Sequence, residues 1–169
     1  MALINLTGIQ PTEYEVLADD AAPSEGATVA VPLARLIDAG DELLATAGNI
    51  GAIIDTETSY DALAAIADKI AFAVIEFPAF GDGRGFSLAV RLRKDYAFKG
   101  EIRAVGPVIP DQALFLLRAG FDTVDAADER KAAFEAALER FPAFYQTDFG
   151  GQVSVAHTRH TEEGQRKAS

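Results

Sequence analysis

The sequence contains no cysteine and only two histidines among its 169 residues. The absence of cysteine excludes disulfide bonds, thiolate metal sites, Cys-ligated iron–sulfur clusters and cysteine nucleophiles. Both histidines, His157 and His160, lie in a polar C-terminal stretch, so we expect neither a metal site nor a Ser-His-Asp site built from the core. No run of about 18 apolar residues and no targeting segment is present, which predicts a cytoplasmic protein without a transmembrane helix.

Positive charge is scarce and unevenly distributed. The net charge is −11, which disfavours nucleic acid and anionic membranes as partners. Arg35 is the only basic residue within residues 1–68, whereas residues 69–118 carry eight lysines and arginines against five acids. This middle segment has two interpretations, an ordinary solvated surface or a local site for an anion or an acidic partner.

The composition, 49% hydrophobic and 24% charged, is typical of one globular domain. We expect a single α/β domain over residues 1–149, with a weakly patterned part at 1–50 and a repeating strand–helix core at 51–141. Residues 150–169 are expected to form a disordered tail. Strands are predicted at 14–17, 28–31, 51–55, 71–77, 102–105 and 121–124, and helices begin at 32, 41, 59, 86, 111 and 128.

Alternating strands and helices predict a mostly parallel sheet with flanking helices, in a Rossmann-like or flavodoxin-like layout. The run at 71–77 is apolar without alternation, as expected of a strand buried on both faces. Ligands of such sheets bind beyond the carboxyl ends of the strands, which points to the turns at 77–85, 106–111 and 125–128.

The turn Gly81-Asp82-Gly83-Arg84-Gly85 is the most unusual of these, since its glycines allow close approach to the backbone at a helix start. It matches neither a Walker A loop nor a dinucleotide fingerprint. Two interpretations stay open: an anion or partner site, or a tight loop in which Asp82 or Ser87 caps the helix. The candidate ligand or partner residues are Glu76, Asp82, Gly83, Arg84, Gly85, Ser87, Arg103, Gly106, Asp111 and Gln112.

Glu76 stands near the end of an apolar strand, and a buried carboxylate needs a partner. Arg103 or Arg84 is expected to supply it, either as an internal ion pair or, less favoured, as part of an acid–base site. Asp111 is expected to act as a helix N-cap rather than as a ligand, and Gln112 to be exposed.

The order of elements in residues 50–141 resembles a phospho-receiver domain. The chemistry does not transfer, because the central strand carries Glu76 where a receiver has its acceptor aspartate. The expected serine or threonine and lysine are replaced at Val105-Gly106 and Val124-Asp125. At most, this resemblance implies a receiver-like fold without phosphorylation.

A more specific resemblance rests on three blocks in order: residues 77–89, residues 100–106 with Asp111-Gln112, and Arg118-Ala119-Gly120-Phe121-Asp122. They resemble the bacterial domain-of-unknown-function family 934. Its members commonly lie beside genes of assimilatory sulfite reduction, so the resemblance implies a role in that pathway. It supplies no catalytic residues.

These observations favour an accessory or partner-binding protein of sulfur assimilation without its own redox centre, with sulfite reductase or another enzyme of the pathway as partner. A small-ligand enzyme or oxidoreductase acting on an oxyanion or phosphorylated ligand at residues 82–87 is the first alternative, and a receiver-like signalling domain is the second. No cofactor and no metal is expected, although FMN or another phosphate-bearing ligand stays open. Whether the protein catalyses a reaction and whether it forms homo-oligomers also stay open.

Overall fold

A computed structural model describes residues 1–18, 20–140 and 149 of the chain. Within these residues it has seven strands: β1 (Ala2–Asn5), β2 (Glu15–Val16), β3 (Thr28–Pro32), β4 (Asn49–Asp55), β5 (Phe72–Glu76), β6 (Glu101–Val105) and β7 (Thr123–Ala126). Its α-helices are α1 (Leu33–Thr46), α2 (Tyr60–Ile66), α3 (Arg84–Lys94), α4 (Ala113–Ala119) and α5 (Lys131–Glu139). Two 3-10 turns, η1 (Pro110–Gln112) and η2 (Asp128–Arg130), precede α4 and α5. The chain is therefore an α/β protein, as the sequence predicts.

The strands form one curled, mixed sheet in the order β1-β7-β6-β5-β4-β3-β2. Strands β2 to β7 are parallel, and β1 pairs antiparallel with β7 at one edge. A flavodoxin-like sheet reverses its strand order at a switch point, whereas β2 to β7 follow the chain without reversal. The Rossmann-like or flavodoxin-like layout and the receiver-like arrangement are therefore not confirmed.

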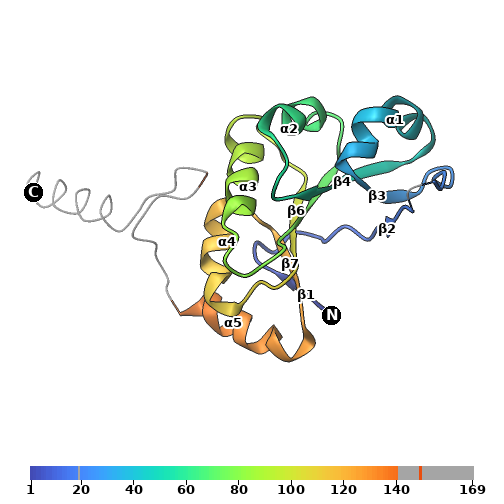
Figure 1. Cartoon of the computed structure of the whole chain (residues 1–169). Helices are drawn as coiled ribbons and strands as arrows, with labels where there is room; N and C mark the ends of the chain where they lie inside the picture. Colours follow the sequence, from blue (N-terminus) through green and yellow to red (C-terminus); the bar gives the residue numbers. More distant parts are fainter. Residues whose placement is uncertain (19, 141–148, 150–169) are drawn as a thin grey trace, which may run out of the picture.

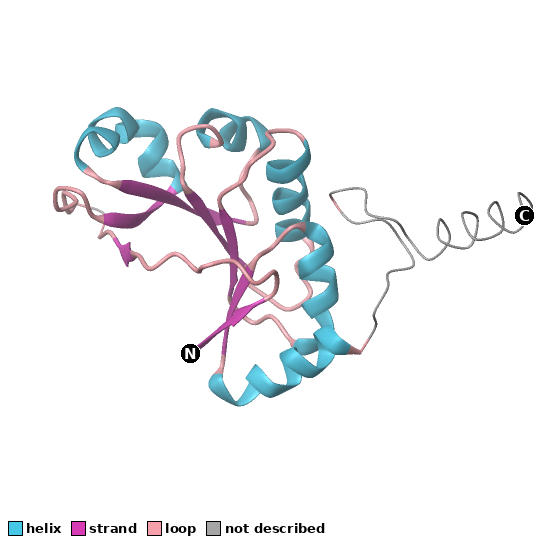
Figure 2. Ribbon diagram, turned by 180° about the vertical axis from the view of Figure 1, so that it is seen from behind, coloured by secondary structure: helices cyan, strands magenta, loops and turns pink. Residues whose placement is uncertain are grey.

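This unreversed order sends every helix to the same side of the sheet, because parallel crossovers are right-handed. Figures 1 and 2 show the helices fanned around the outside of the curled sheet, which leaves its inner face without a helix. We call the helix-covered side the outer face and the opposite side the inner face.

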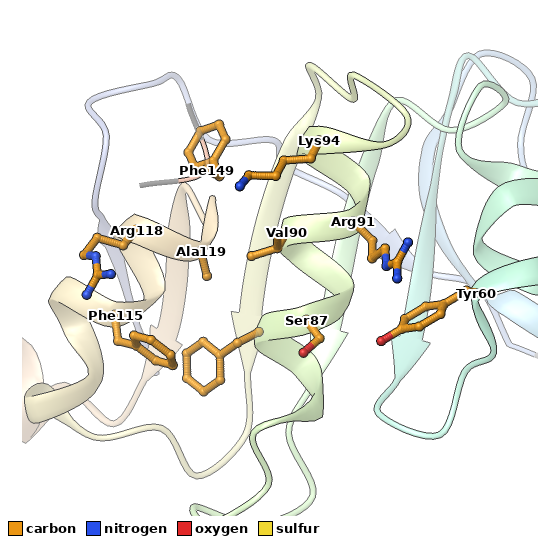
Figure 3. A pocket seen from close by; sticks show the side chains of 10 residues that line it. Tyr60, Ser87, Val90, Arg91, Lys94, Phe115, Arg118, Ala119 and Phe149 are labelled. Atoms are coloured by element: carbon orange, nitrogen blue, oxygen red, sulfur yellow. The ribbon is translucent and has the colours of Figure 1, made fainter. Parts of the chain in front are cut away.

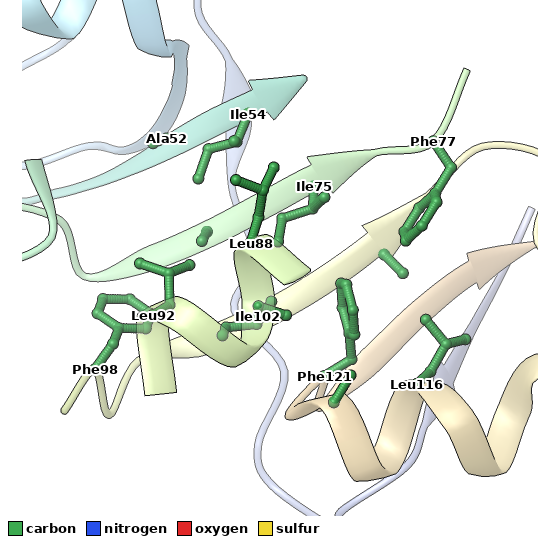
Figure 4. Close-up of a cluster of buried hydrophobic side chains, with 14 of the residues drawn as sticks. Ala52, Ile54, Ile75, Phe77, Leu88, Leu92, Phe98, Ile102, Leu116 and Phe121 are labelled. Atoms are coloured by element: carbon green, nitrogen blue, oxygen red, sulfur yellow. The ribbon is translucent and has the colours of Figure 1, made fainter. Parts of the chain in front are cut away.

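The main core lies between the outer face and the helices. Alternate residues of the central strands, such as Ile54, Ile75 and Ile102, point into it and are fully buried. Leu88 and Leu92, one turn apart on α3, cover them (Figure 4). The prediction that the 71–77 run is buried on both faces is confirmed, because Phe72 and Val74 are buried in a second cluster on the inner face.

An N-terminal strap, residues 6–14, crosses the inner face (Figure 2). The ring of Tyr14 stacks on that of Phe72 with 4.9 Å between the centroids. The amide of Leu6 donates to the carbonyl of Asp122 over 2.7 Å. The strap thus takes the place that a second helix layer has in a doubly wound sheet.

Local structure departs from the sequence prediction at several points. Gly40 does not end a helix, because α1 runs on to Thr46 as one element instead of two. Pro32 ends β3 and precedes the first helical residue. Strand β1 was not predicted, and the helix expected from residue 128 starts as the 3-10 turn η2. Ser59 caps α2 as predicted, with its hydroxyl accepting from the amide of Ala62.

Gly120 confirms its predicted role at the end of α4, with φ of +104° and its amide bonded to the carbonyl of Leu116. The predicted tail at 150–169 and the residue Phe141 lie outside the described residues. Within the described part of the chain, no helix has the length and apolar character needed to cross a membrane.

Candidate functional site

Three loops meet at the carboxyl ends of β4, β5 and β6, the edge that the sequence singles out. The hydroxyl of Thr56, just after β4, donates to Asp82 Oδ2 in the loop after β5 over 2.6 Å. Gln112 Nε2, in the segment after β6, donates to the carbonyl of Phe80 over 3.3 Å. The side-chain oxygen of Gln112 accepts from the amide of Ile109 over 3.1 Å. Gln112 therefore ties two loops together instead of standing free in solvent.

Arg84 and Asp82 form a hydrogen-bonded ion pair at the start of α3, which we call the clasp. The carboxylate accepts from Arg84 Nε at 3.0 Å and from Arg84 Nη2 at 2.8 Å, and it also accepts from the amide of Arg84 at 3.0 Å. Hydrogen bonds from the Arg84 side chain, followed by that from Thr56, hold the pKa of Asp82 well below its usual value. The same carboxylate raises the pKa of Arg84. The position that would hold an external anion is thus occupied by the protein's own carboxylate.

The glycines of the site serve the backbone and the packing. Gly85 is buried, and a Cβ there would stand 2.6 Å from the ring of Phe77. Gly106 has φ of +108°, and a Cβ there would overlap the carbonyl oxygen of Phe77. Gly83 precedes α3 in open space, and Ser87 is exposed on the first turn without capping the helix.

Glu76 corrects one expectation from the sequence. Its side chain is exposed and forms no ion pair with any residue that the structure describes. It is the last residue of β5, and alternation along the strand puts it on the same inner face as Phe72 and Val74, which no helix covers (Figure 2). Register explains why Arg103 does not reach it: Val105 pairs with Glu76, whereas Arg103 pairs with Val74, further from the edge.

Arg103 is instead buried on the inner face beside Glu101. Its Nε and Nη2 donate to Glu101 Oε1 at 2.9 and 2.8 Å, and Nη2 also donates to the carbonyl of Thr12 at 2.7 Å. The amide of Thr12 and the hydroxyl of Thr123 donate to the Glu101 carboxylate. Burial alone raises the pKa of Glu101, but the hydrogen bonds from Thr123, Thr12 and Arg103 outweigh it, and the pKa lies below its usual value.

This ion pair joins the strap to the sheet and was not predicted. The signal was present in the sequence, because residues two apart on a strand share a face. Glu101 and Arg103 therefore had to be neighbours if residues 101–105 formed a strand.

Asp111 does not cap a helix. It lies exposed within the 3-10 turn η1, and α4 begins after Gln112 without a side-chain cap. The 3-10 turn starts at Pro110, three residues before the first residue of α4, and Gln112 rather than Asp111 stands at the N-cap position.

A hollow of about 590 Å³ opens at this edge of the sheet. Its polar lining comprises three exposed carboxylates, a buried hydroxyl and one guanidinium already held in the clasp: Asp55, Glu57, Glu76, Thr56 and Arg84. Arg84 also lies 3.6 Å from Glu57 Oε1. The balance of charge here is acidic, which does not favour an oxyanion.

A second hollow lies on the outer face, between α3, α4 and the start of α2 (Figure 3). It encloses about 420 Å³ and is lined by ten residues: Tyr60, Phe86, Ser87, Val90, Arg91, Lys94, Phe115, Arg118, Ala119 and Phe149. We call it the helix groove. Three of these side chains are basic and none is acidic. Only Ser87 of the predicted site residues belongs to it, although the basic character of residues 69–118 pointed to this part of the chain.

No group of three or more histidine, aspartate or glutamate side chains suited to a metal ion occurs within residues 1–18 and 20–140. His157 and His160 lie outside the described residues.

The fold and these two sites define a class: an α/β protein with a one-sided helix layer, an acidic edge at the ends of its strands and a basic groove between its helices. Residues 51–156 match the model of a family described as bacterial protein of unknown function (DUF934). The chain belongs to this family, as its motifs indicate. No curated protein matches the chain.

Proposed function

We propose that this protein is an accessory protein that binds a partner enzyme of sulfur assimilation and carries no redox centre of its own. The observation that supports it best is the helix groove, where exposed aromatic rings and cations gather on a chain of net charge −11. Tyr60 and Phe115 are 46% and 49% exposed, and aromatic side chains together with arginine are enriched in protein interfaces.

The candidate reactive groups support the same proposal. Asp82 and Arg84 are engaged with each other, and Glu101 and Arg103 hold the strap. These pairs stabilise the fold, which leaves the exposed helix layer as the surface best suited to recognition.

Sulfite reductase is the partner that the family resemblance suggests. The test is a binding titration of the immobilised full-length protein with purified sulfite reductase from the same bacterium. We expect saturable binding that weakens between about 0.1 M and about 1 M salt, because the Debye length falls from roughly 10 Å to roughly 3 Å. Arg84→Ala, which lies outside the helix groove, should bind like the wild type. No association at low salt would overturn the proposal.

A small-ligand enzyme is the second candidate, favoured by the 590 Å³ hollow at the edge where parallel sheets hold their ligands. Its test is thermal unfolding with FMN, sulfite, sulfate and adenylyl sulfate. A ligand at 100 times its dissociation constant stabilises the folded state by about 2.7 kcal/mol, which is a measurable shift. We expect no shift with these anions, given the acidic lining. A shift that disappears in Arg84→Ala would make this candidate the better one.

A further inference from the structure

We infer that the helix groove binds an acidic segment of a partner protein and that an apolar side chain of that segment fills the space between α3 and α4. The inference rests on the proposed function as a partner-binding protein and adds the surface and the chemistry of the partner.

Two helix stripes build the groove. On α3, Ser87, Val90, Arg91 and Lys94 follow the spacing i, i+3, i+4, i+7, so they share one face of that helix. On α4, the facing stripe consists of Phe115, Arg118 and Ala119 with the same spacing. Figure 3 shows the two stripes on neighbouring helices.

The floor of the groove is small and apolar, and its walls are aromatic. Val90 and the buried Ala119 leave room between the helices. Phe115, half exposed, packs against the buried ring of Phe86 with 4.5 Å between the ring centroids. An apolar side chain entering here would contact Phe115 without moving it, and such preformed pockets hold the anchor residues of interfaces.

The opposite wall of the groove is formed by Arg91 and Tyr60, and contacts within the chain hold these side chains in place. The guanidinium of Arg91 lies 4.3 Å from the ring centroid of Tyr60, and its Nη1 contacts Asp95 Oδ2 at 2.6 Å. Tyr96 Oη donates to the carbonyl of Tyr60 over 3.3 Å. Fixing these side chains in advance lowers the entropy that binding must overcome.

Charge selects the partner. Lys94 is exposed and forms no ion pair with any other described residue, and no carboxylate lines the groove. A segment with aspartates or glutamates beside its apolar side chain therefore complements the groove. A second copy of this chain fits less well, because a head-to-tail contact of an acidic surface with this groove leaves one groove and one acidic surface free, so that further copies add until a ring closes or a filament forms.

The first experiment places a photo-crosslinking benzoylphenylalanine at Phe115 in the full-length protein expressed in its own host. Phe80 is the matched control position, because it is also an exposed phenylalanine, at 56%, but lies outside the groove. Mass spectrometry then identifies the crosslinked peptide. We expect position 115, but not position 80, to capture a segment of another protein rich in aspartate and glutamate.

The second experiment repeats the capture, and a titration with the identified partner, in a charge-reversed pair of variants. Lys94→Glu lies in the groove and Lys99→Glu lies outside it, while both change the net charge equally. We expect Lys94→Glu to weaken binding about tenfold or more, and Lys99→Glu to change it less than about twofold. Thermal unfolding of each variant confirms that the fold is intact.

Three results would overturn the inference. The first is that position 115 captures no protein, or no more than position 80 does. The second is that position 115 crosslinks to this chain or to a second copy of it. The third is that Lys94→Glu and Lys99→Glu change binding equally. If sulfite reductase binds but Lys94→Glu binds as tightly as the wild type, the groove is wrong and the proposed function stands. If position 115 captures an acidic segment of an enzyme outside sulfur assimilation, the groove stands and the proposed pathway is wrong.

Discussion

Replacing Arg103 by methionine is expected to destabilise the protein strongly. The variant keeps a side chain of similar length but leaves the Glu101 carboxylate without its cation, and the two side chains are only 8% and 2% exposed. Breaking a buried ion pair costs about 3–5 kcal/mol. Glu101 keeps its hydrogen bonds from Thr12 and Thr123, so we expect a loss near the lower end, about 3 kcal/mol.

Urea unfolding followed by circular dichroism measures this loss. With a slope of about 2 kcal/mol per molar urea, the midpoint should fall by about 1.5 M. Lys131→Met is the matched control, because the Lys131–Glu135 pair is more than half exposed on both sides and spans 3.9 Å. Its midpoint should move by less than about 0.3 M, since exposed pairs contribute about 0.5 kcal/mol or less.

The double variant Arg103→Met with Glu101→Gln separates the charge from the packing. It removes the unpaired carboxylate, so it should be more stable than Arg103→Met alone. A stabilising role of the buried Arg103–Glu101 pair is refuted if Arg103→Met unfolds within about 0.3 M urea of the wild type, or if the double variant is no more stable than the single one.

The pKa of Glu101 adds a pH dependence. Because its pKa is lower in the folded protein than in the unfolded chain, the stability that it contributes is present above the ordinary carboxyl pKa of about 4.3 and is lost as pH falls through the folded value. The loss of stability on acidification should therefore be smaller in Glu101→Gln than in the wild type.

Three further predictions concern the same sheet. Burial, with a smaller contribution from Glu101, raises the pKa of Asp125 despite the opposing charge of Arg103, so ionisation of Asp125 lowers the stability of the fold as pH rises through the folded pKa. The variant Asp125→Asn should therefore have a higher melting temperature than the wild type at pH 7 and the same melting temperature at about pH 3. Gly106→Ala, at a positive φ and against the carbonyl of Phe77, should cost about 1–3 kcal/mol in urea unfolding. Tyr14→Ala should bind more of a hydrophobic dye such as ANS, because Phe72 loses its cover; unchanged dye binding would contradict the role of the strap.

The alternation of strands and helices was predictable because it depends on local patterns. The 71–77 run, for example, is apolar at every position but one and is buried on both faces as expected. The order of strands was not predictable, because nothing local in a crossover says whether the next strand lies on the left or the right of the last. The alternation of strands and helices therefore predicts a sheet covered by helices, whereas the N-terminal strap covers the inner face.

The sequence predicts that the loops at the carboxyl ends of the strands meet, but it does not predict how their side chains pair. The loops after β5 and β6 do meet, as Gln112 and Phe80 show. The sequence could not reveal that Asp82 would turn its carboxylate onto Arg84, since the two alternatives for that loop used the same residues. An acid in an apolar strand predicts a buried carboxylate, but Glu76 is the last residue of β5, where the strand leaves the core, and its side chain is exposed.

The unreversed strand order also affects how this chain can fold while the ribosome synthesises it. Strands β3 to β7 each pair with the strand made just before, so the sheet can grow as it emerges. The N-terminal residues are the exception: Ala2 and Asn5 pair with Ala126 and Thr123, more than a hundred positions later. Strand β1 therefore has to wait for its partner strand β7 to be synthesised, and until then one side of the nascent protein stays open to chaperones.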